Sequence, residues 1–457
     1  MGDDFPRVLF ITPHAFNKAT GGGITFSNLF DGWPSDRIAT AHTDPEPTTG
    51  DVCTNYFVLG AEEFDLAAPF AMARRAIGRA AVAGGPSGPT ATFPATDASG
   101  PPPALPGEKR AVLRSALIRS AARVLGDGLP ERVVLSDRLC KWIEAFEPDV
   151  LYTILGSNGM MRLVREVRDR YKVPVVVHFM DDWMSSYHRG GLLGPAMRRE
   201  MVALVQDAVQ GARTCLGISP AMCEAFSHRF GRPFEVFQNT IDVSRWARMA
   251  KGRRVSGSPA DIVYAGSIFP NAQLESLVDC CRAVAALDDS GIAATLTISS
   301  PSGQAGRYRD RLAIHPSIQI TDTIRDDEAF FHRIAAADLL LLPVNFSRQS
   351  IRFIRYSMPT KVPAYLAVGT PIFAYGPRET AQMRYAEREG WAFTLSERNA
   401  DALVEKLKNA LCDEGARARV SAAAMTAASR HHDAATVRAR FRDMLRVAAG
   451  KECGVSA

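Results

Sequence analysis

Residues Leu339–Pro377 read LLLLPVNFSRQSIRFIRYSMPTKVPAYLAVGTPIFAYGP, and they carry the clearest indication of the fold class. It opens with an apolar run that has the length of one buried strand, and Pro371–Tyr375 forms a second such run. A helix is expected to begin near Thr360, between the two runs. Two apolar strands joined by a helix form the βαβ unit of a parallel sheet whose faces are both covered.

Similar apolar runs recur along the chain and alternate with longer segments of helical character. This alternation predicts a doubly wound α/β pattern that occurs twice. The expected strands are Val8–Ile11, Val150–Thr153, Val173–His178 and Cys215–Ile218 in the first half, and Ile262–Ala265, Thr295–Ser299, Ile318–Thr321, Leu339–Val344 and Pro371–Tyr375 in the second.

A linker is expected at Trp246–Pro259, which turns basic and then rich in Ser, Gly and Pro. It separates an N-terminal domain, 1–245, from a C-terminal domain, 258–430. Residues 431–457 are expected to form a closing helix that can return to the N-terminal domain. Within that domain, residues 84–107 are rich in Pro and Gly and indicate a flexible insertion.

Composition limits the classes of protein that remain. The 457 residues are 46% hydrophobic and 23% charged, which excludes a fibrous or wholly disordered chain. A net charge of +5 gives no reason to expect nucleic acid as a partner. The eight cysteines form no C-x-x-C pair, and the apolar runs are short, so a cytoplasmic protein with reduced cysteines is expected.

Two segments that flank the insertion combine apolar and basic residues at helical spacing. They are Phe70–Val82 and Ala111–Leu125. Such helices either pack on the domain with their arginines in solvent, or attach to an anionic membrane surface. The second interpretation places the protein at the inner face of the plasma membrane.

Three contiguous glycines, Gly21 to Gly23, follow the first strand and precede a helix. They come too late for the G-x-G-x-x-G dinucleotide motif, which begins directly at the strand end. Bare backbone N–H groups at a helix N-terminus suit an anion such as a diphosphate, so Gly22 and Gly23 are candidate phosphate-binding residues. A plain flexible surface loop is the alternative.

The segment HFMDDW begins at His178, at the end of an expected strand. Ligands of open α/β sheets bind at the carboxyl ends of strands, so His178, Asp181 and Asp182 are candidate catalytic residues that contact sugar or acceptor hydroxyls. Two alternatives are open. The aspartates could hold a divalent metal, although two side chains are few ligands, or one of them could cap a helix.

Cations gather in the loop after the strand that begins at Leu339. They are Arg348, Arg352, Arg355 and Lys361. Basic side chains beside a helix N-terminus form a good diphosphate site, whereas arginines that point into solvent would carry no function.

Three stretches resemble the nucleotide-sugar glycosyltransferases of the GT-B fold, especially the retaining enzymes of glycosyltransferase family 4. LGISPAMCEAFSHRFGRPFEVFQNTID, from Leu216, is similar to the family's approach to the hinge between domains, with Ser219, Asn239 and Asp242 at the characteristic positions. IVYAGSIFPNAQLESLVDCC, from Ile262, is similar to the opening of the donor domain. PTKVPAYLAVGTPIFAYG, from Pro359, resembles the nucleotide-binding helix.

The resemblance implies a GT-B fold, in which two Rossmann-like domains with doubly wound parallel sheets face a central cleft. It implies transfer of a sugar from a nucleoside diphosphate to a saccharide or lipid-linked acceptor, with retention of configuration, no metal ion and a role in polysaccharide biosynthesis. The departing phosphate would accept the acceptor's proton. The implied hinge residues are Asn239 and Asp242. The implied donor-binding residues are Gly22, Gly23, Gly266, Ser267, Arg352, Thr360, Lys361 and Tyr365.

Two departures from the family pattern keep other functions open. Ala364 stands where the family helix usually carries a ribose-binding Glu, and Gly266-Ser267 replaces a turn that often bears Arg and Lys. A nucleotide-sugar epimerase of the same fold, or a non-catalytic partner subunit, are therefore the alternative functions.

Overall fold

The computed structural model describes residues 5–17, 21–44, 49–67, 88–90, 130–249 and 259–451. The chain divides into two compact units. The first comprises residues 1–217, 223–237 and 438–457, and the second comprises residues 218–222 and 238–437. The two predicted basic helices lie outside the described residues, as does most of the predicted insertion at 84–107.

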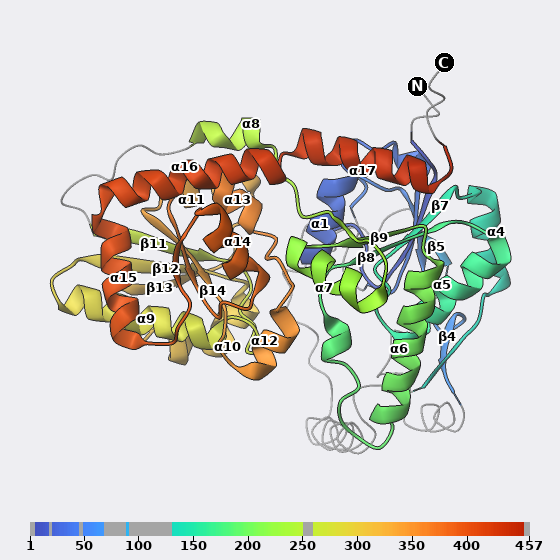
Figure 1. Cartoon of the computed structure of the whole chain (residues 1–457), viewed down its shortest axis with the longest axis horizontal. Helices are drawn as coiled ribbons and strands as arrows, with labels where there is room; N and C mark the ends of the chain where they lie inside the picture. Colours follow the sequence, from blue (N-terminus) through green and yellow to red (C-terminus); the bar gives the residue numbers. More distant parts are fainter. Residues whose placement is uncertain are drawn as a thin grey trace, which may run out of the picture. The chain divides into compact units, whose positions relative to one another are not determined.

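The first unit is built on an eight-stranded sheet in the order β10-β9-β8-β7-β1-β2-β3-β5 (Figure 1). Neighbouring strands pair in parallel, except that β5 pairs antiparallel with β3. The strands are β1 (Val8–Thr12), β2 (Ile38–His42), β3 (Asn55–Val58), β5 (Gly88–Thr90), β7 (Val150–Thr153), β8 (Val175–Phe179), β9 (Thr214–Gly217) and β10 (Glu235–Val236), with β4 (Phe64–Leu66) and β6 (Glu131–Val133) forming a separate antiparallel pair.

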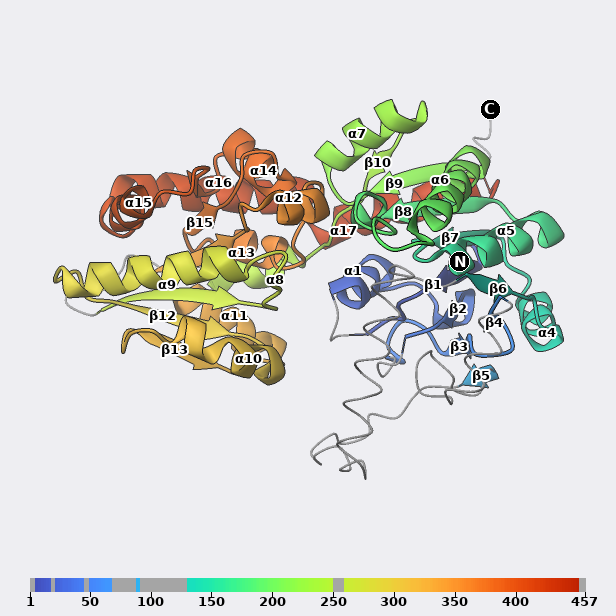
Figure 2. The ribbon, with the colours of Figure 1, turned by 90° about the horizontal axis from the view of Figure 1, so that it is seen from below.

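Aromatic rings pack one face of this sheet. Phe10 of β1 lies 5.0 Å from the ring centre of Phe26 and 4.9 Å from that of Tyr152. Helix α1 supplies Phe26 and lies beside β1 in Figure 2, and Phe441 of α17 packs 5.8 Å from Tyr152. The helices are α1 (Gly21–Phe30), α4 (Asp137–Phe146), α5 (Asn158–Tyr171), α6 (Gly194–Gly211), α7 (Pro220–Phe230) and α17 (Ala434–Ala448).

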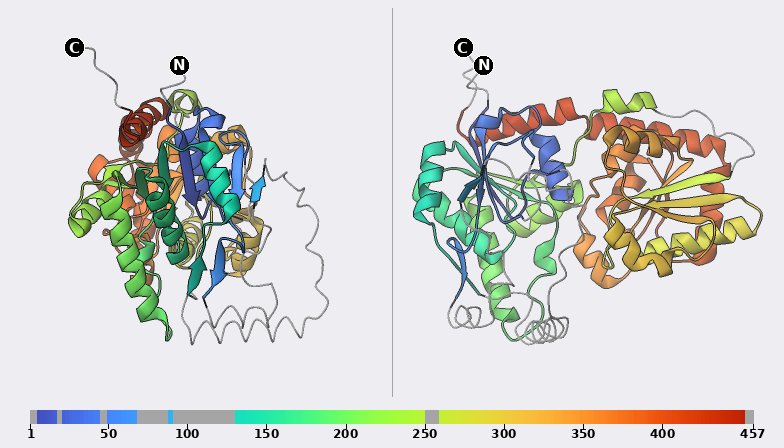
Figure 3. Two further views of the ribbon diagram at one scale, coloured as in Figure 1. Left: turned by 90° about the vertical axis from the view of Figure 1, so that its right-hand side faces the viewer. Right: turned by 180° about the vertical axis from the view of Figure 1, so that it is seen from behind.

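The second unit is built on a six-stranded parallel sheet in the order β13-β12-β11-β14-β15-β16. Helices cover both faces, with α9 and α16 on opposite sides of the sheet (Figures 1 and 3). The strands are β11 (Ala260–Ala265), β12 (Ala294–Ser299), β13 (Ile318–Thr321), β14 (Leu339–Pro343), β15 (Ile372–Tyr375) and β16 (Phe393–Leu395). The helices are α8 (Val243–Trp246), α9 (Leu274–Asp289), α10 (Ser302–Leu312), α11 (Asp327–Ala336), α12 (Arg348–Ile354), α13 (Val362–Ala367), α14 (Ala381–Glu389), α15 (Ala400–Cys412) and α16 (Glu414–His431).

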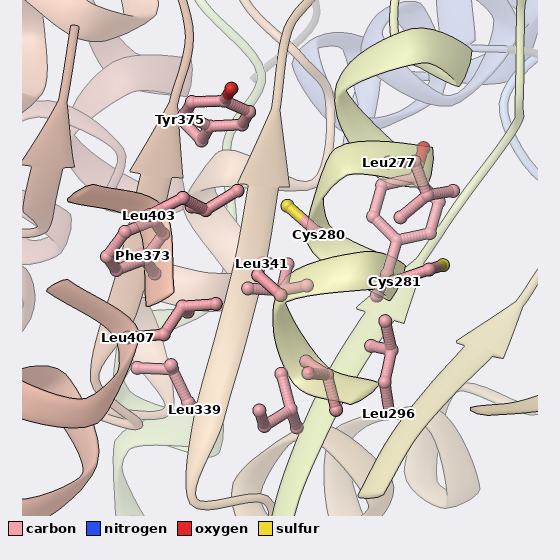
Figure 4. Close-up of a cluster of buried hydrophobic side chains, with 14 of the residues drawn as sticks. Leu277, Cys280, Cys281, Leu296, Leu339, Leu341, Phe373, Tyr375, Leu403 and Leu407 are labelled. Carbon is pink, nitrogen blue, oxygen red and sulfur yellow. The ribbon is translucent and has the colours of Figure 1, made fainter. Parts of the chain in front are cut away.

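The core of the second unit lies between this sheet and the helices α9 and α15. Figure 4 shows Leu277 and Cys280 of α9, Leu341 and Phe373 of the sheet, and Leu407 of α15 in one cluster. These side chains are fully buried, which explains why the strands read as continuous apolar runs in the sequence.

The predicted fold class, α/β with two doubly wound parallel sheets, is confirmed. All nine expected strands are present with ends shifted by at most two residues, and β7 and β13 match their predicted ranges. The prediction missed six described strands: β2, β3, β4, β6, β10 and β16. It was also wrong at Gly88–Thr90, where an edge strand forms inside the expected irregular insertion; Pro89 is tolerated there because an edge strand leaves one row of backbone groups unpaired.

The two units meet along the chain at residue 237, whereas the predicted domain ended at 245. The intervening segment is tied to the second unit by backbone hydrogen bonds. The amide of Ile241 donates to the carbonyl of His432 at 2.9 Å, and the amide of Ala434 donates to the carbonyl of Ile241 at 2.9 Å. From residue 438 onward, α17 belongs to the first unit.

Within the described ranges, no helix is both long and apolar enough to cross a membrane. The seven described cysteines form no disulfide, and six of them are buried.

Candidate functional site

Lys361 lies at the carboxyl edge of the six-stranded sheet. Its Nζ donates a hydrogen bond to the carbonyl of Ala265, the last residue of β11, at 2.9 Å. The same ammonium lies 3.8 Å from the centre of the Tyr264 ring, within the range of a cation–π interaction. The centre of this sheet edge therefore carries a cation that is held by one carbonyl and one aromatic face.

Gly266 explains how the lysine reaches this position. Its φ is +138°, a backbone conformation that L side chains rarely adopt. A Cβ at Gly266 would lie 2.9 Å from Nζ of Lys361, closer than real Cβ contacts come. The glycine that replaces the family's basic turn thus leaves room for a cation that comes from another loop.

The electrostatics of this site favour an anionic ligand. Burial lowers the pKa of Lys361 to about 7, because the ammonium is poorly solvated. Among the described residues, no carboxylate forms an ion pair with Lys361. A ligand with negative charge would restore the solvation that the ammonium lost, so the edge is suited to a phosphate or diphosphate.

The Tyr365 side chain lies inside the second unit and not at its surface. The residue is fully buried, and its hydroxyl accepts a hydrogen bond from the amide of Ala265 at 3.0 Å. It therefore fixes α13 against the end of β11. The Tyr365 side chain thus supports the helix that follows Lys361, and a direct contact with the donor stays a prediction.

The other predicted donor residues differ in their surroundings. The carbonyl of Ser267 accepts a hydrogen bond from the Tyr264 hydroxyl at 2.5 Å, which places this turn beside Lys361. Thr360 precedes Lys361 and is partly buried, whereas Arg352 is exposed on α12. The structure thus brings Gly266, Ser267, Thr360 and Lys361 together, whereas no hydrogen bond or ion pair within the described residues joins Arg352 to them.

Ser219 and Asn239, two of the residues in the stretch that resembles the family's hinge, hold the loop that carries Lys361. The Ser219 hydroxyl donates to the carbonyl of Tyr356 at 2.7 Å, and Nδ2 of Asn239 donates to the carbonyl of Thr360 at 2.8 Å. Asp242 caps α8 by accepting from the amide of Arg245 at 3.0 Å, and hydrogen bonds, first from the Ser244 hydroxyl, lower the pKa of its carboxyl group. The sequence marked Asn239 as a hinge residue but gave no signal that it supports this loop.

His178, the first predicted catalytic residue, lies in the core of the first unit. It is fully buried in β8, with Nε2 3.1 Å from the carbonyl of Phe237 and Nδ1 2.5 Å from the Tyr152 hydroxyl. A carbonyl can only accept, so Nε2 carries the hydrogen and Nδ1 accepts from the tyrosine. Burial lowers the pKa of His178 to about 3, so the ring is neutral. With both nitrogens occupied, the geometry favours a structural role.

Asp182 caps the short 3₁₀ helix Trp183–Ser185, the alternative that the sequence left open. Its carboxylate accepts from the amide of Ser185 at 3.3 Å and from the hydroxyl of the same serine. Burial raises the pKa of this carboxyl group. Asp181 is less buried and lies at the same strand end, where it stays a candidate for contact with a substrate. In the described part of the chain, no three His, Cys, Asp or Glu side chains are grouped so that they could hold a metal ion.

The glycine triplet belongs to α1 itself, so its interpretation as a loop was wrong. The helix begins at Gly21, and Gly22 and Gly23 lie in its first turn. A Cβ at Gly23 would come within 2.4 Å of the Asn17 side chain, whereas a Cβ at Gly22 would make only ordinary contacts. The absence of a side chain at Gly23 thus leaves room for Asn17, and the binding of a phosphate by Gly22 and Gly23 stays a prediction.

Comparisons with solved structures confirm the GT-B fold. The Anabaena HepE structure in complex with UDP-glucose is 12% identical, with a TM-score of 0.56 over 96% of this chain and 99% of that one. Sucrose-phosphate synthase from Thermosynechococcus elongatus is 10% identical, with a TM-score of 0.60 over 98% and 100%. The trehalose 6-phosphate synthase of Burkholderia multivorans is 11% identical, with a TM-score of 0.55 over 99% and 100%.

No protein-family model matches the sequence, and no curated protein sequence matches it significantly. At identities this low, the structural similarity establishes the two-unit α/β architecture and leaves the chemistry to the residues of the site.

Proposed function

We propose that the protein is a glycosyltransferase that takes a sugar from a nucleoside diphosphate sugar. The observation that carries this proposal is the Lys361 ammonium, which lies at the carboxyl edge of a parallel sheet beside Gly266 and without a carboxylate partner among the described residues. Ligands of open α/β sheets bind at this edge. The UDP-glucose complex of HepE, which has the same fold, supports a nucleotide-sugar donor.

The chemical task of such a site is to stabilise charge. As the bond between the sugar and the diphosphate breaks, negative charge develops on the leaving group, and a positioned cation lowers the barrier. Lys361 is the cation of the second unit that we assign to this task, with the backbone of Gly266 and Ser267 beside it. Asn239 and Ser219 keep the Lys361 loop in place and act as positioning residues.

Finer features of the reaction follow from the family resemblance and belong to the proposal. We propose a hexosyl donor, retention of configuration at the transferred carbon, and a leaving phosphate that takes the acceptor's proton, with no metal ion. The proposed acceptor is a saccharide or lipid-linked saccharide of polysaccharide biosynthesis, met at the cytoplasmic face of the membrane. Asp181 is the proposed contact for a sugar hydroxyl, whereas His178 supports the core.

A thermal-shift screen of UDP, GDP, ADP and CDP tests the donor. A ligand present at 100 times its Kd adds about 2.7 kcal/mol to the stability of the folded state. For a unit of this size, that raises Tm by about 5 to 10 °C. One nucleoside diphosphate is expected to give such a shift, and the absence of a shift with all four would contradict the proposal.

Product analysis with the matching donor sugar then separates the three functions. Transfer to an added saccharide is expected. Conversion of the donor without any acceptor would identify an epimerase, and binding without turnover would identify a non-catalytic subunit.

A further inference from the structure

In the sheet of the first unit, the direction in which the chain adds successive strands reverses at one point. The chain runs from β1 to β2 and β3 on one side, and from β7 to β8, β9 and β10 on the other. The order therefore reverses between β1 and β7, and ligands of such sheets bind outside the carboxyl ends of the strands at this point. The loops that follow β1 and β7 are the place to search for a second substrate site.

These two loops approach each other closely. A Cβ at Gly156, whose φ is +102°, would lie 3.0 Å from the Pro13 ring. Leu155 has a φ of +64°, which is uncommon for a residue other than glycine. The Thr43 hydroxyl, after β2, also donates to the carbonyl of Pro13 at 3.4 Å. The loop after β1 is thus fixed from two sides, and the loop after β7 carries, at Leu155, a strained backbone conformation of the kind found at functional sites.

A histidine and a buried carboxylate lie in this fixed region. The His14 side chain is 50% exposed, and its Nδ1 lies 3.9 Å from Oδ2 of Asp44, whose side chain is only 4% exposed. The same Oδ2 accepts hydrogen bonds from the amide of Ala15 at 3.2 Å and from Nδ2 of Asn17 at 3.3 Å. The buried carboxylate is therefore held by hydrogen bonds from the loop after β1, whereas the His14 imidazole next to it is half exposed to solvent.

A second histidine does not neutralise this carboxylate. Burial lowers the pKa of His42 to about 4, so its ring is neutral at physiological pH although Asp44 lies nearby. Neither of its ring nitrogens has a hydrogen-bond partner within the described part of the chain.

The pair has a definite chemical preference. Oδ2 of Asp44 already acts as an acceptor toward Ala15 and Asn17, so the histidine tautomer with hydrogen on Nδ1 is favoured beside it. Nε2 of His14 then presents a lone pair, which can accept a hydrogen bond from a hydroxyl group. At 3.9 Å, Nδ1 of His14 and Oδ2 of Asp44 are beyond hydrogen-bond distance, and a contact of this kind can tighten when the substrate binds.

We propose that His14, oriented by Asp44, is an acceptor-binding residue of the first unit and accepts a hydrogen bond from a hydroxyl of the acceptor saccharide. The inference rests on the proposed function, in which the attacking hydroxyl passes its proton to the leaving diphosphate. His14 therefore binds a neighbouring hydroxyl, and Asp44 is a positioning residue that acts through it.

Steady-state transfer to a p-nitrophenyl hexoside that the wild-type protein glycosylates tests the inference. His14→Ala is expected to raise the acceptor KM by about tenfold to a hundredfold, with Kd for the nucleoside diphosphate and the rate of donor hydrolysis unchanged. His14→Gln is expected to restore part of the loss, because its amide oxygen can accept a hydrogen bond. Asp44→Asn, which can donate to Nδ1 and so favours the other tautomer, is expected to act like His14→Ala.

His315→Ala is a matched control, because His315 also lies near an aspartate, Asp289, at 3.3 Å, but in the second unit. It is expected to leave the acceptor KM unchanged. The double variant His14→Ala/Asp44→Asn should lose no more than His14→Ala alone. An unchanged acceptor KM in His14→Ala, or additive losses in the double variant, would overturn the inference. A wild-type protein that transfers no sugar would instead overturn the proposed function.

Discussion

Lys361→Ala is expected to weaken binding of the nucleoside diphosphate by about a hundredfold, equivalent to about 3 kcal/mol. The ammonium is the charge that this site offers to the diphosphate, and alanine leaves only the Ala265 carbonyl and the Tyr264 ring, neither of which attracts an anion. Direct titration of the diphosphate, followed by calorimetry, measures the effect. The corresponding nucleoside, which has no phosphate, should bind both proteins equally.

Lys406→Ala is the control for this loss, because Lys406 is an exposed lysine on α15 of the same unit. It removes the same unit of charge without touching the sheet edge. If both variants weaken binding equally, the effect comes from overall charge, and the assignment of Lys361 to the diphosphate is wrong.

Through its fully buried histidines, acid is expected to destabilise the first unit about twice as much as the second, where the partly buried His431, whose pKa is also lowered by burial, adds a further loss. Burial lowers the pKa of His178 to about 3 and that of His42 to about 4 in the first unit, and that of His432 to about 4 in the second. In the unfolded chain these groups take up protons near pH 6.5. The unfolded state therefore binds more protons between pH 6.5 and pH 4, so stability is complete above this range and falls as the pH drops.

Each buried histidine should cost about 2 kcal/mol of stability between pH 7 and pH 5. The expected losses are thus about 4 kcal/mol for the first unit and about 2 kcal/mol for the second. Hydrogen exchange resolved by peptide, at several pH values, measures the two units separately. His178→Gln should reduce the pH dependence of the first unit by about half, since glutamine does not titrate; an unchanged pH dependence would contradict this account.

The sequence predicted the fold well because a strand that is buried on both faces appears in the sequence as a continuous run of apolar residues. The range Val150–Thr153 was predicted without error for this reason. The missed strand β2 reads IATAH, in which Ala, Thr and His reduce the apolar signal although every residue is buried. The sequence also predicted that Lys361 lies at the carboxyl edge of the sheet, because it stands in the segment that follows an expected strand.

The sequence could not predict which polar residues are accessible. His178 ends a strand, as a catalytic residue would, but its partners Tyr152 and Phe237 are 26 and 59 residues away, so their contacts were not visible. The same holds for Asn239, whose partner Thr360 is 121 residues away. The contact between Gly23 and the Asn17 side chain was not visible in the sequence either, because it forms only where the start of α1 packs against the loop after β1.

The central claim is that a lysine with a lowered pKa receives the diphosphate of the donor. In the free protein, a Lys361 side chain with a pKa of about 7 is mostly neutral at pH 7.5, and it becomes charged in the complex, so binding should take up about 0.8 proton. Affinity should then fall by up to tenfold for each pH unit above 7. Calorimetric titration of the nucleoside diphosphate at pH 7.5, in two buffers of different ionisation enthalpy, counts these protons. The account predicts uptake that Lys361→Ala abolishes, and binding without proton uptake would contradict it.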